Sequence, residues 1–208
     1  MSTRATVLAL ARIEGRRLAR HPFVLAGAVI PLVVCLQILA SDDTETDYAW
    51  TLLVPFMSVA AGVLVAVNLA ALRARRDGAE ELYRSLPTPI TARTAAHLVS
   101  LAWAVAVAAL LVAIAVLILL SKGTPLPATA HAVTTPALVV VCGALGLALA
   151  RWLPHPAVAT VGVVAVFALA NGGGVLGGSA RGLVVVGFLG LAALCGALAL
   201  LRDRAQLA

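Results

Sequence analysis

The sequence predicts an all-α membrane protein, a single transmembrane domain over residues 1–208 that crosses the bilayer six times. Three observations predict it: the composition, the long uncharged stretches and the placement of the basic residues. Of the 208 residues, 62% are hydrophobic and only 12% are charged, with a mean hydropathy of +1.05. Ordinary soluble chains are about a quarter charged. Polar side chains are therefore too few to cover a water-facing surface, and lipid must replace water around much of the chain.

Long stretches without acidic or basic residues supply the predicted spans. A helix needs about 20 apolar residues to cross about 30 Å of hydrocarbon, and helices are expected because lipid offers the backbone no hydrogen-bond partners. We predict spans over about residues 23–40, 50–72, 95–120, 132–152, 154–171 and 183–201. The fifth is short, opens with Pro-His-Pro and ends in glycines, which favours a tilted or partly re-entrant helix.

The basic residues orient the chain. Lys and Arg concentrate in the cytoplasmic loops of membrane proteins. With six spans and a cytoplasmic amino end, 13 of the 15 basic residues lie inside, and only Lys122 and Arg181 lie outside. Both termini are therefore predicted to be cytoplasmic. The net charge of +6 reflects this topology and does not indicate a nucleic-acid partner.

An amphipathic interfacial helix is predicted over residues 6–20, ahead of the first span. One face carries three arginines at four-residue spacing: Arg12, Arg16 and Arg20. Glu14 interrupts the opposite, apolar face, where Arg17 stands at the i+3 spacing of an ion pair. Binding of the arginines to anionic membrane lipid explains the basic face but gives no reason for Glu14. The His21-Pro22 pair then breaks the helix.

The loop between the second and third spans carries a second short helix. Asp77 followed by Glu80 has the spacing of a capping box, and Pro87 ends the two turns that follow. The side chains form an apolar ridge with a mixed-charge rim: Glu80, Glu81, Leu82, Tyr83, Arg84 and Leu86. Such a ridge suits the groove of a partner protein, and it equally suits a helix lying in the membrane interface.

In this order the motifs resemble those of a known family. The run Arg-x-Glu-x-Arg-Arg-Leu-x-Arg-His-Pro (Arg12 to Pro22) precedes two spans, and Glu-Glu-Leu-Tyr-Arg-Ser-Leu-Pro-Thr-Pro-Ile-Thr-Ala-Arg (Glu80 to Arg93) precedes four. The chain is similar in this to the membrane subunits, or permeases, of bacterial type-2 ABC exporters. The resemblance implies a connecting helix over residues 6–20 and a coupling helix over residues 79–86 that docks into an ATPase. It departs at the carboxyl end, where only a glycine-rich linker joins the last two spans.

The same resemblance implies partners and location. The chain would work as a homodimer, or with a related permease subunit, beside ABC ATPase subunits that bind ATP and Mg²⁺. It would bind no cofactor itself and would not be an enzyme. The sequence has no Gly-Lys-Ser/Thr phosphate-binding loop, so the energy would come from the partner. These expectations place it in the bacterial cytoplasmic membrane, where it would move an unidentified amphiphilic substrate outward.

Two other classes of function stay open. The second is a non-transporting scaffold, assembly factor or immunity protein whose cytoplasmic helices bind a partner. The third is a small secondary transporter, which is disfavoured because no predicted span carries Asp, Glu or Lys in its interior.

The remaining polar and sulfur-bearing residues give little chemistry. The four histidines are scattered over loops and helix ends, without the spacing of a metal site. The three cysteines are best explained as small buried apolar residues: Cys35, Cys142 and Cys195. Gln37, Asn68 and Asn171 are the notable polar side chains in or near spans, and by default they are interhelical hydrogen-bond partners.

Overall fold

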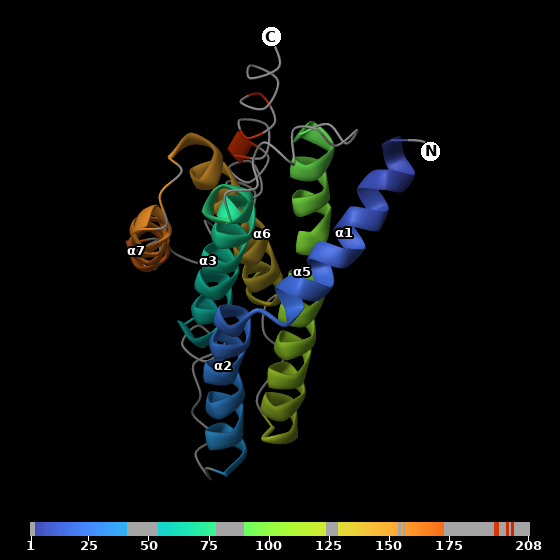
Figure 1. Ribbon diagram of the computed structural model, residues 1–208. Helices are drawn as coiled ribbons and strands as arrows, with labels where there is room; N and C mark the ends of the chain where they lie inside the picture. The colour runs from blue at the N-terminus through green and yellow to red at the C-terminus, as the bar shows by residue number, and fades with distance from the viewer. Residues whose placement is uncertain are drawn as a thin grey trace.

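Helices account for nearly all of the residues that the structure describes. The computed structural model describes residues 3–40, 54–77, 90–123, 129–153, 155, 157–172, 194–195, 199 and 201. The helices in these ranges are α1 (Thr3–Ala19), α2 (Pro22–Ala40), α3 (Val54–Arg76), α5 (Ile90–Ser121), α6 (Thr129–Trp152) and α7 (Ala157–Gly172) (Figure 1). The predicted all-α fold is thereby confirmed for this part of the chain.

Four of these helices are long and apolar enough to cross a membrane. Their candidate spans are Pro22–Ala40, Pro55–Arg73, Thr91–Ser121 and Val133–Trp152. They coincide with the first four predicted spans. The bounds differ most in α3 and α5, since both helices continue through charged residues outside the predicted spans: α3 ends at Arg76 and α5 begins at Ile90, before Arg93.

α7 corresponds to the predicted fifth span, and it is short. Its 16 residues rise about 24 Å, less than the roughly 30 Å of hydrocarbon. Figure 1 looks nearly along the axis of α7, whereas α3 and α5 are seen from the side. α7 therefore lies across the bundle, which agrees with a tilted or re-entrant helix. The predicted sixth span, 183–201, falls almost entirely outside the described residues, so a six-span topology stays a prediction.

α2 and α3 pack against each other through glycines. A Cβ added to Gly27 would lie 2.5 Å from the backbone oxygen of Ser58, and one added to Gly62 would overlap the carbonyl of Phe23. The Ser58 hydroxyl also donates a 2.7 Å hydrogen bond to the Gly27 carbonyl. Small residues permit such close approach between membrane helices. The contacts of Gly27 and Gly62 set an antiparallel register in which the first half of α2 lies beside the first half of α3.

The core of the bundle is α3 against α6. In each of these candidate spans 67% of the residues are buried, against 22% in α2. Asn68 is fully buried in α3, and its Nδ2 donates a 3.1 Å hydrogen bond to the Gly146 carbonyl of α6. The prediction that Asn68 is an interhelical partner is confirmed. Gln37 is exposed on α2, and the side chain of Asn171 lies outside the described residues.

The three cysteines are free and buried, as predicted. By contrast, the outside of the bundle carries many large apolar side chains, among them Leu36 of α2 at 64% exposure and Leu117 of α5 at 65%. Soluble proteins avoid large apolar patches of this kind. Lipid-facing helices require them, so the surface and the composition point to the same environment.

Candidate functional site

α1 lies where the sequence predicts an amphipathic helix, and it packs on α5. It begins three residues before the predicted start and ends one residue before the predicted end. Ala11 and Leu18 are buried on its apolar face. Gly15 rests on Trp103 of α5, where an added Cβ would overlap the indole ring. The other face exposes three arginines: Arg12, Arg16 and Arg20. α5 therefore covers one side of α1, and Leu8 and Ile13 are exposed together with the three arginines.

A tight turn at His21 joins α1 directly to α2. The His21 amide donates a 3.0 Å hydrogen bond to the Leu18 carbonyl, and its own carbonyl accepts one of 3.0 Å from the Leu25 amide. One residue thus ends α1 and begins α2. Pro22 occupies the first position of α2, where its missing amide hydrogen has no intrahelical acceptor to lose. The predicted helix break is confirmed, and it links α1 to the first candidate span without a flexible linker.

Charged and titratable side chains gather where α1 meets the ends of three other helices. We name this group the junction cluster: Glu14, Arg17, His21, Arg73, His97 and Arg151. Glu14 pairs with Arg17 at 3.2 Å, as the sequence predicted. Glu14, Arg73 and Arg151 all lie close enough to His97 to act on it electrostatically. Glu14 is the one carboxylate in this basic group, which explains why it interrupts an apolar face.

Hydrogen bonds fix the same region from the side of α5 and α6. The Arg151 guanidinium, in the last turn of α6, donates a 2.7 Å hydrogen bond to the Thr94 hydroxyl in the first turns of α5. Thr94 is fully buried. The Ser100 hydroxyl donates to the His97 carbonyl at 2.7 Å. The junction cluster therefore brings side chains of α1, α3, α5 and α6 together at one end of the bundle, where the Arg151 bond joins α6 to α5.

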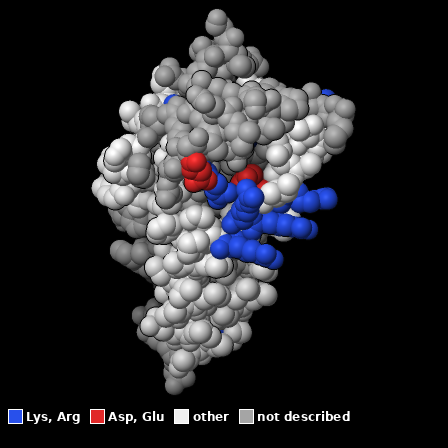
Figure 2. All heavy atoms as spheres, in the orientation of Figure 1, with Lys and Arg blue, Asp and Glu red and all other residues white. Residues whose placement is uncertain are grey.

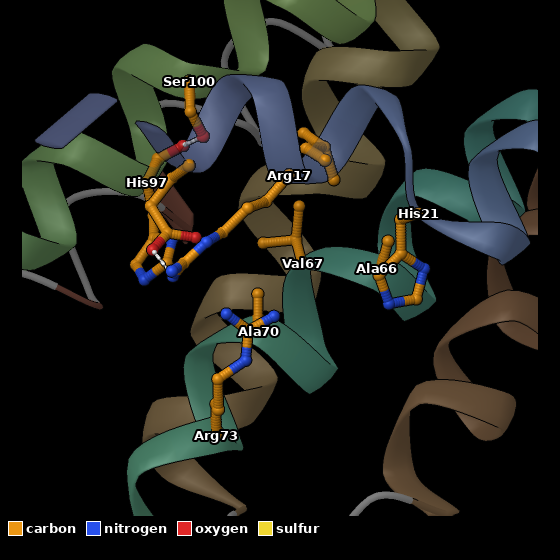
Figure 3. A pocket seen from close by; sticks show the side chains of 10 residues that line it. Arg17, His21, Ala66, Val67, Ala70, Arg73, His97 and Ser100 are labelled. Atoms are coloured by element: carbon orange, nitrogen blue, oxygen red, sulfur yellow. Dashed lines mark hydrogen bonds and ion pairs between the residues drawn. The ribbon is translucent and has the colours of Figure 1, made fainter. Parts of the chain in front are cut away.

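The junction cluster surrounds a small pocket. In Figure 3 the Arg17 side chain extends toward His97 on one side of the pocket. His21 lies on the other side, with Val67 of α3 between them. Small residues of α3, including Ala66 and Ala70, also line it. The cavity measures about 10 Å³, which is about the room that one water molecule needs. It cannot enclose an organic substrate, so this pocket is not a transport chamber.

His21 is held in its neutral form by its surroundings. Burial, and secondly the positive charge of Arg73, lower the pKa of His21 below its usual 6.5. Its Nδ1 is buried and has no hydrogen-bond partner among the residues that the structure describes. The ring stacks on Phe23, with centroids 5.7 Å apart. An imidazole nitrogen without a partner among the described residues therefore lies within electrostatic reach of Arg73.

The exposed arginines of α1 form a compact basic patch. Figure 2 shows blue side chains gathered on one part of the visible face, at the level where α1 crosses α5. The exposed residues that make up this patch are Arg12, Arg16, Arg17 and Arg20. Below it the visible face is almost wholly uncharged. Such a step from basic to apolar surface is typical of a membrane interface.

The predicted coupling helix cannot be placed. Its residues lie outside the described ranges: Glu80, Glu81, Leu82, Tyr83, Arg84 and Leu86. The ends of that loop are described, because α3 is followed by Asp77 and α5 begins at Ile90.

The junction cluster also contains residues that sequence reasoning missed, namely Arg73, His97 and Arg151. A signal was present, since all three stand near span ends that the charge distribution puts on one side of the membrane.

These features define the class of the protein, a multi-pass helical membrane protein with four candidate spans among its described residues. No protein-family model matches the chain, and neither a curated protein nor a solved structure does. The same described residues hold no group of three side chains suited to a metal ion.

Proposed function

We propose that the chain is the membrane-spanning subunit of an ATP-driven exporter, an ABC-type permease that dimerises and works with separate cytoplasmic ATPase subunits. The observation that carries this proposal is the junction cluster. It brings side chains of α1 next to those of α3, α5 and α6, and the turn at His21 joins α1 to α2. A force applied to α1 would therefore reach all four candidate spans.

The loop between α3 and α5 has the same mechanical access. Arg73 stands one turn before Asp77, where the loop leaves α3, and His97 stands two turns after Ile90, where the chain enters α5. A displacement of this loop would move the ends of both helices together. An ATPase that grips the loop and α1 would tilt the spans, which is what alternating access requires.

The substrate path in this proposal runs outside the single chain. The pocket at the junction cluster is too small for a substrate. α2 is the most exposed candidate span, and only 22% of it is buried. Apart from Gln37, its outward side chains are apolar, so a path formed between two copies would suit an amphiphilic molecule.

Charge reversal in the loop tests the proposal. The double variant Glu80→Lys/Glu81→Lys is expected to abolish co-purification of the proposed ATPase subunit and the ATP-driven export by membrane vesicles. Membrane insertion should stay normal. The matched control is Asp42→Lys/Asp43→Lys, which makes the same charge change in the predicted outside loop and should leave both measurements intact.

Two results would contradict the proposal. In the first, the loop variant still binds the ATPase and exports as well as the natural chain. In the second, the co-purified partner hydrolyses no ATP, which would favour the scaffold, assembly or immunity function. Transport that follows a proton gradient without ATP would instead indicate a secondary transporter.

A further inference from the structure

We propose that the pocket at the junction cluster is a binding site for the phosphate headgroup of an anionic phospholipid, in the leaflet on which α1 lies. This inference does not depend on the transport proposal, since a scaffold of the same fold would carry the same site. Its argument rests on the charge of the pocket, on the room in it and on the surface next to it.

The pocket has more positive than negative charge. Arg17 and Arg73 line it from α1 and α3, and Glu14 is the carboxylate that lines it. Glu14 already pairs with Arg17, so the charge of Arg73 is left for another anion among the lining groups. Arginine is the side chain best suited to phosphate, because its guanidinium can donate two parallel hydrogen bonds.

A second polar group points to a missing ligand. The His21 Nδ1 is buried without a hydrogen-bond partner in the described part of the chain, and His21 lines the same pocket (Figure 3). Buried polar atoms without partners are rare in native structures. A phosphate oxygen, or a water that it holds, would complete the hydrogen bonding of this group.

The size of the pocket places the phosphate at its mouth. A cavity of about 10 Å³ admits about one water and cannot enclose a phosphate. A headgroup whose acyl chains remain in the bilayer stays at the mouth in any case. The pocket therefore suits a tethered phosphate better than a free anion that would need to be surrounded.

The surface beside the pocket suits acyl chains. Directly after His21, α2 exposes Phe23 at 48%, Leu25 at 53% and Val29 at 54%. On the other side stands the basic patch of α1 (Figure 2). Basic pockets between membrane helices on the cytoplasmic side are known to bind anionic headgroups. A phospholipid would cover the apolar residues of α2 with its acyl chains and bring its anionic headgroup to the basic patch. An acidic protein would leave the apolar face of α2 uncovered.

Lipid binding to the purified full-length chain tests the inference. The chain in neutral detergent at about 0.15 M salt, where exposed charges are screened beyond about 8 Å, is titrated with phosphatidylglycerol and followed by native mass spectrometry. We expect one tightly retained lipid, and weaker retention of phosphatidylcholine. Arg73→Gln and Arg17→Gln should each weaken phosphatidylglycerol binding about fivefold, the factor equivalent to roughly 1 kcal/mol per basic residue. Arg73→Lys should restore most of it.

The control removes the same charge elsewhere on the same helix. Arg4 is exposed near the start of α1, outside the basic patch and about 20 Å along the helix from Arg17, and Arg4→Gln should change the affinity less than twofold. Thermal unfolding of each variant confirms that it folds. If Arg73→Gln does not fold, Arg17→Gln replaces it in the comparison.

Three outcomes would overturn the inference. They are equal losses in Arg4→Gln and the pocket variants, equal retention of phosphatidylcholine, and displacement of the lipid by excess inorganic phosphate. The last would assign the pocket to a free anion.

Discussion

His21 does two jobs at once in this chain. Its backbone ends one helix and starts the next, and its side chain enters a basic pocket where the neutral imidazole is favoured. The position is constrained by both roles, because a substitution must keep the turn before Pro22 and must not bring a fixed positive charge near Arg73. Few residues satisfy both demands.

The lowered pKa of His21 predicts a pH dependence. Because the folded chain holds His21 with a pKa below 6.5, the unfolded chain binds more protons in the window just below that value. Stability should therefore fall as the pH decreases through this window, and it should be unaffected by His21 above it. Thermal unfolding in detergent between pH 7.5 and about 5 measures this.

Two variants isolate the contribution of His21. His21→Gln should flatten the pH dependence in that window, and the exposed His155→Gln should leave it as in the natural chain. A natural chain whose melting temperature rises as the pH falls through the same window would contradict the assignment.

Asn68 shows how a single buried amide is placed between two spans. Its Nδ2 has a partner in α6, whereas its Oδ1 has none among the described residues. Asn68→Leu should thus cost little, about 0.6 kcal/mol, the average for an interhelical hydrogen bond in a membrane. Asn68→Asp should cost about 3 kcal/mol, because it buries a carboxylate without a donor. Unfolding in increasing concentrations of a denaturing detergent gives the loss of stability in each variant. Equal losses of stability would show that Asn68 Oδ1 does have a donor.

At the scale of elements, close helix approach depends on a few glycines. Gly27 faces backbone atoms of α3, which cannot move aside, whereas Gly15 faces the side chain of Trp103, which can rotate. The α2 and α3 pair is therefore less tolerant of added volume than the α1 and α5 pair. In the proposed exporter, this difference would let α1 shift while the spans stay paired.

A substitution at Gly27 tests this dependence. Gly27→Leu should destabilise the chain by about 1–3 kcal/mol, the usual cost of overpacking, and should weaken the pairing of α2 with α3. Ala26→Leu is the matched control, because Ala26 is the adjacent exposed residue of the same helix and should be neutral. The measurement is thermal unfolding in detergent, and equal effects at both positions would refute the packing described for α2.

Composition and charge predicted the four long helices, α1 and the break at His21, because hydropathy and helix breakers act locally. They did not predict that Arg73, His97 and Arg151 meet, because contacts between distant helices depend on packing that no local pattern contains. The pairing of Glu14 with Arg17 was predictable, since the two residues have the i,i+3 spacing on one helix. The orientation of α7 was only partly predictable, because its length and its flanking prolines limit it without fixing its angle.

At the scale of the whole molecule, the charge distribution predicts which end faces the cytoplasm. The ends of α3 and α5 lie at opposite ends of the bundle (Figure 1). Asp77→Cys should react with a membrane-impermeant maleimide only after cells are permeabilised, and Ser121→Cys should react in intact cells. Both positions are exposed, and the three natural cysteines are buried, so the background should be low. Labelling of both variants from the same side would contradict the topology.

The length of α5 has a consequence for the bilayer around the protein. Its uncharged run from Thr94 to Ser121 would measure about 42 Å as a helix, about 12 Å more than an average hydrocarbon core, while α2 with 19 residues measures about 28 Å. Both helices cannot match one thickness. The chain therefore creates a hydrophobic mismatch, which α5 must relieve by tilting, by leaving the core near His97, or by thickening the lipid around it. A thicker membrane would place the junction cluster closer to the hydrocarbon core, and a thinner one would leave it outside. The lipid composition of the host membrane would therefore affect the environment of the junction cluster.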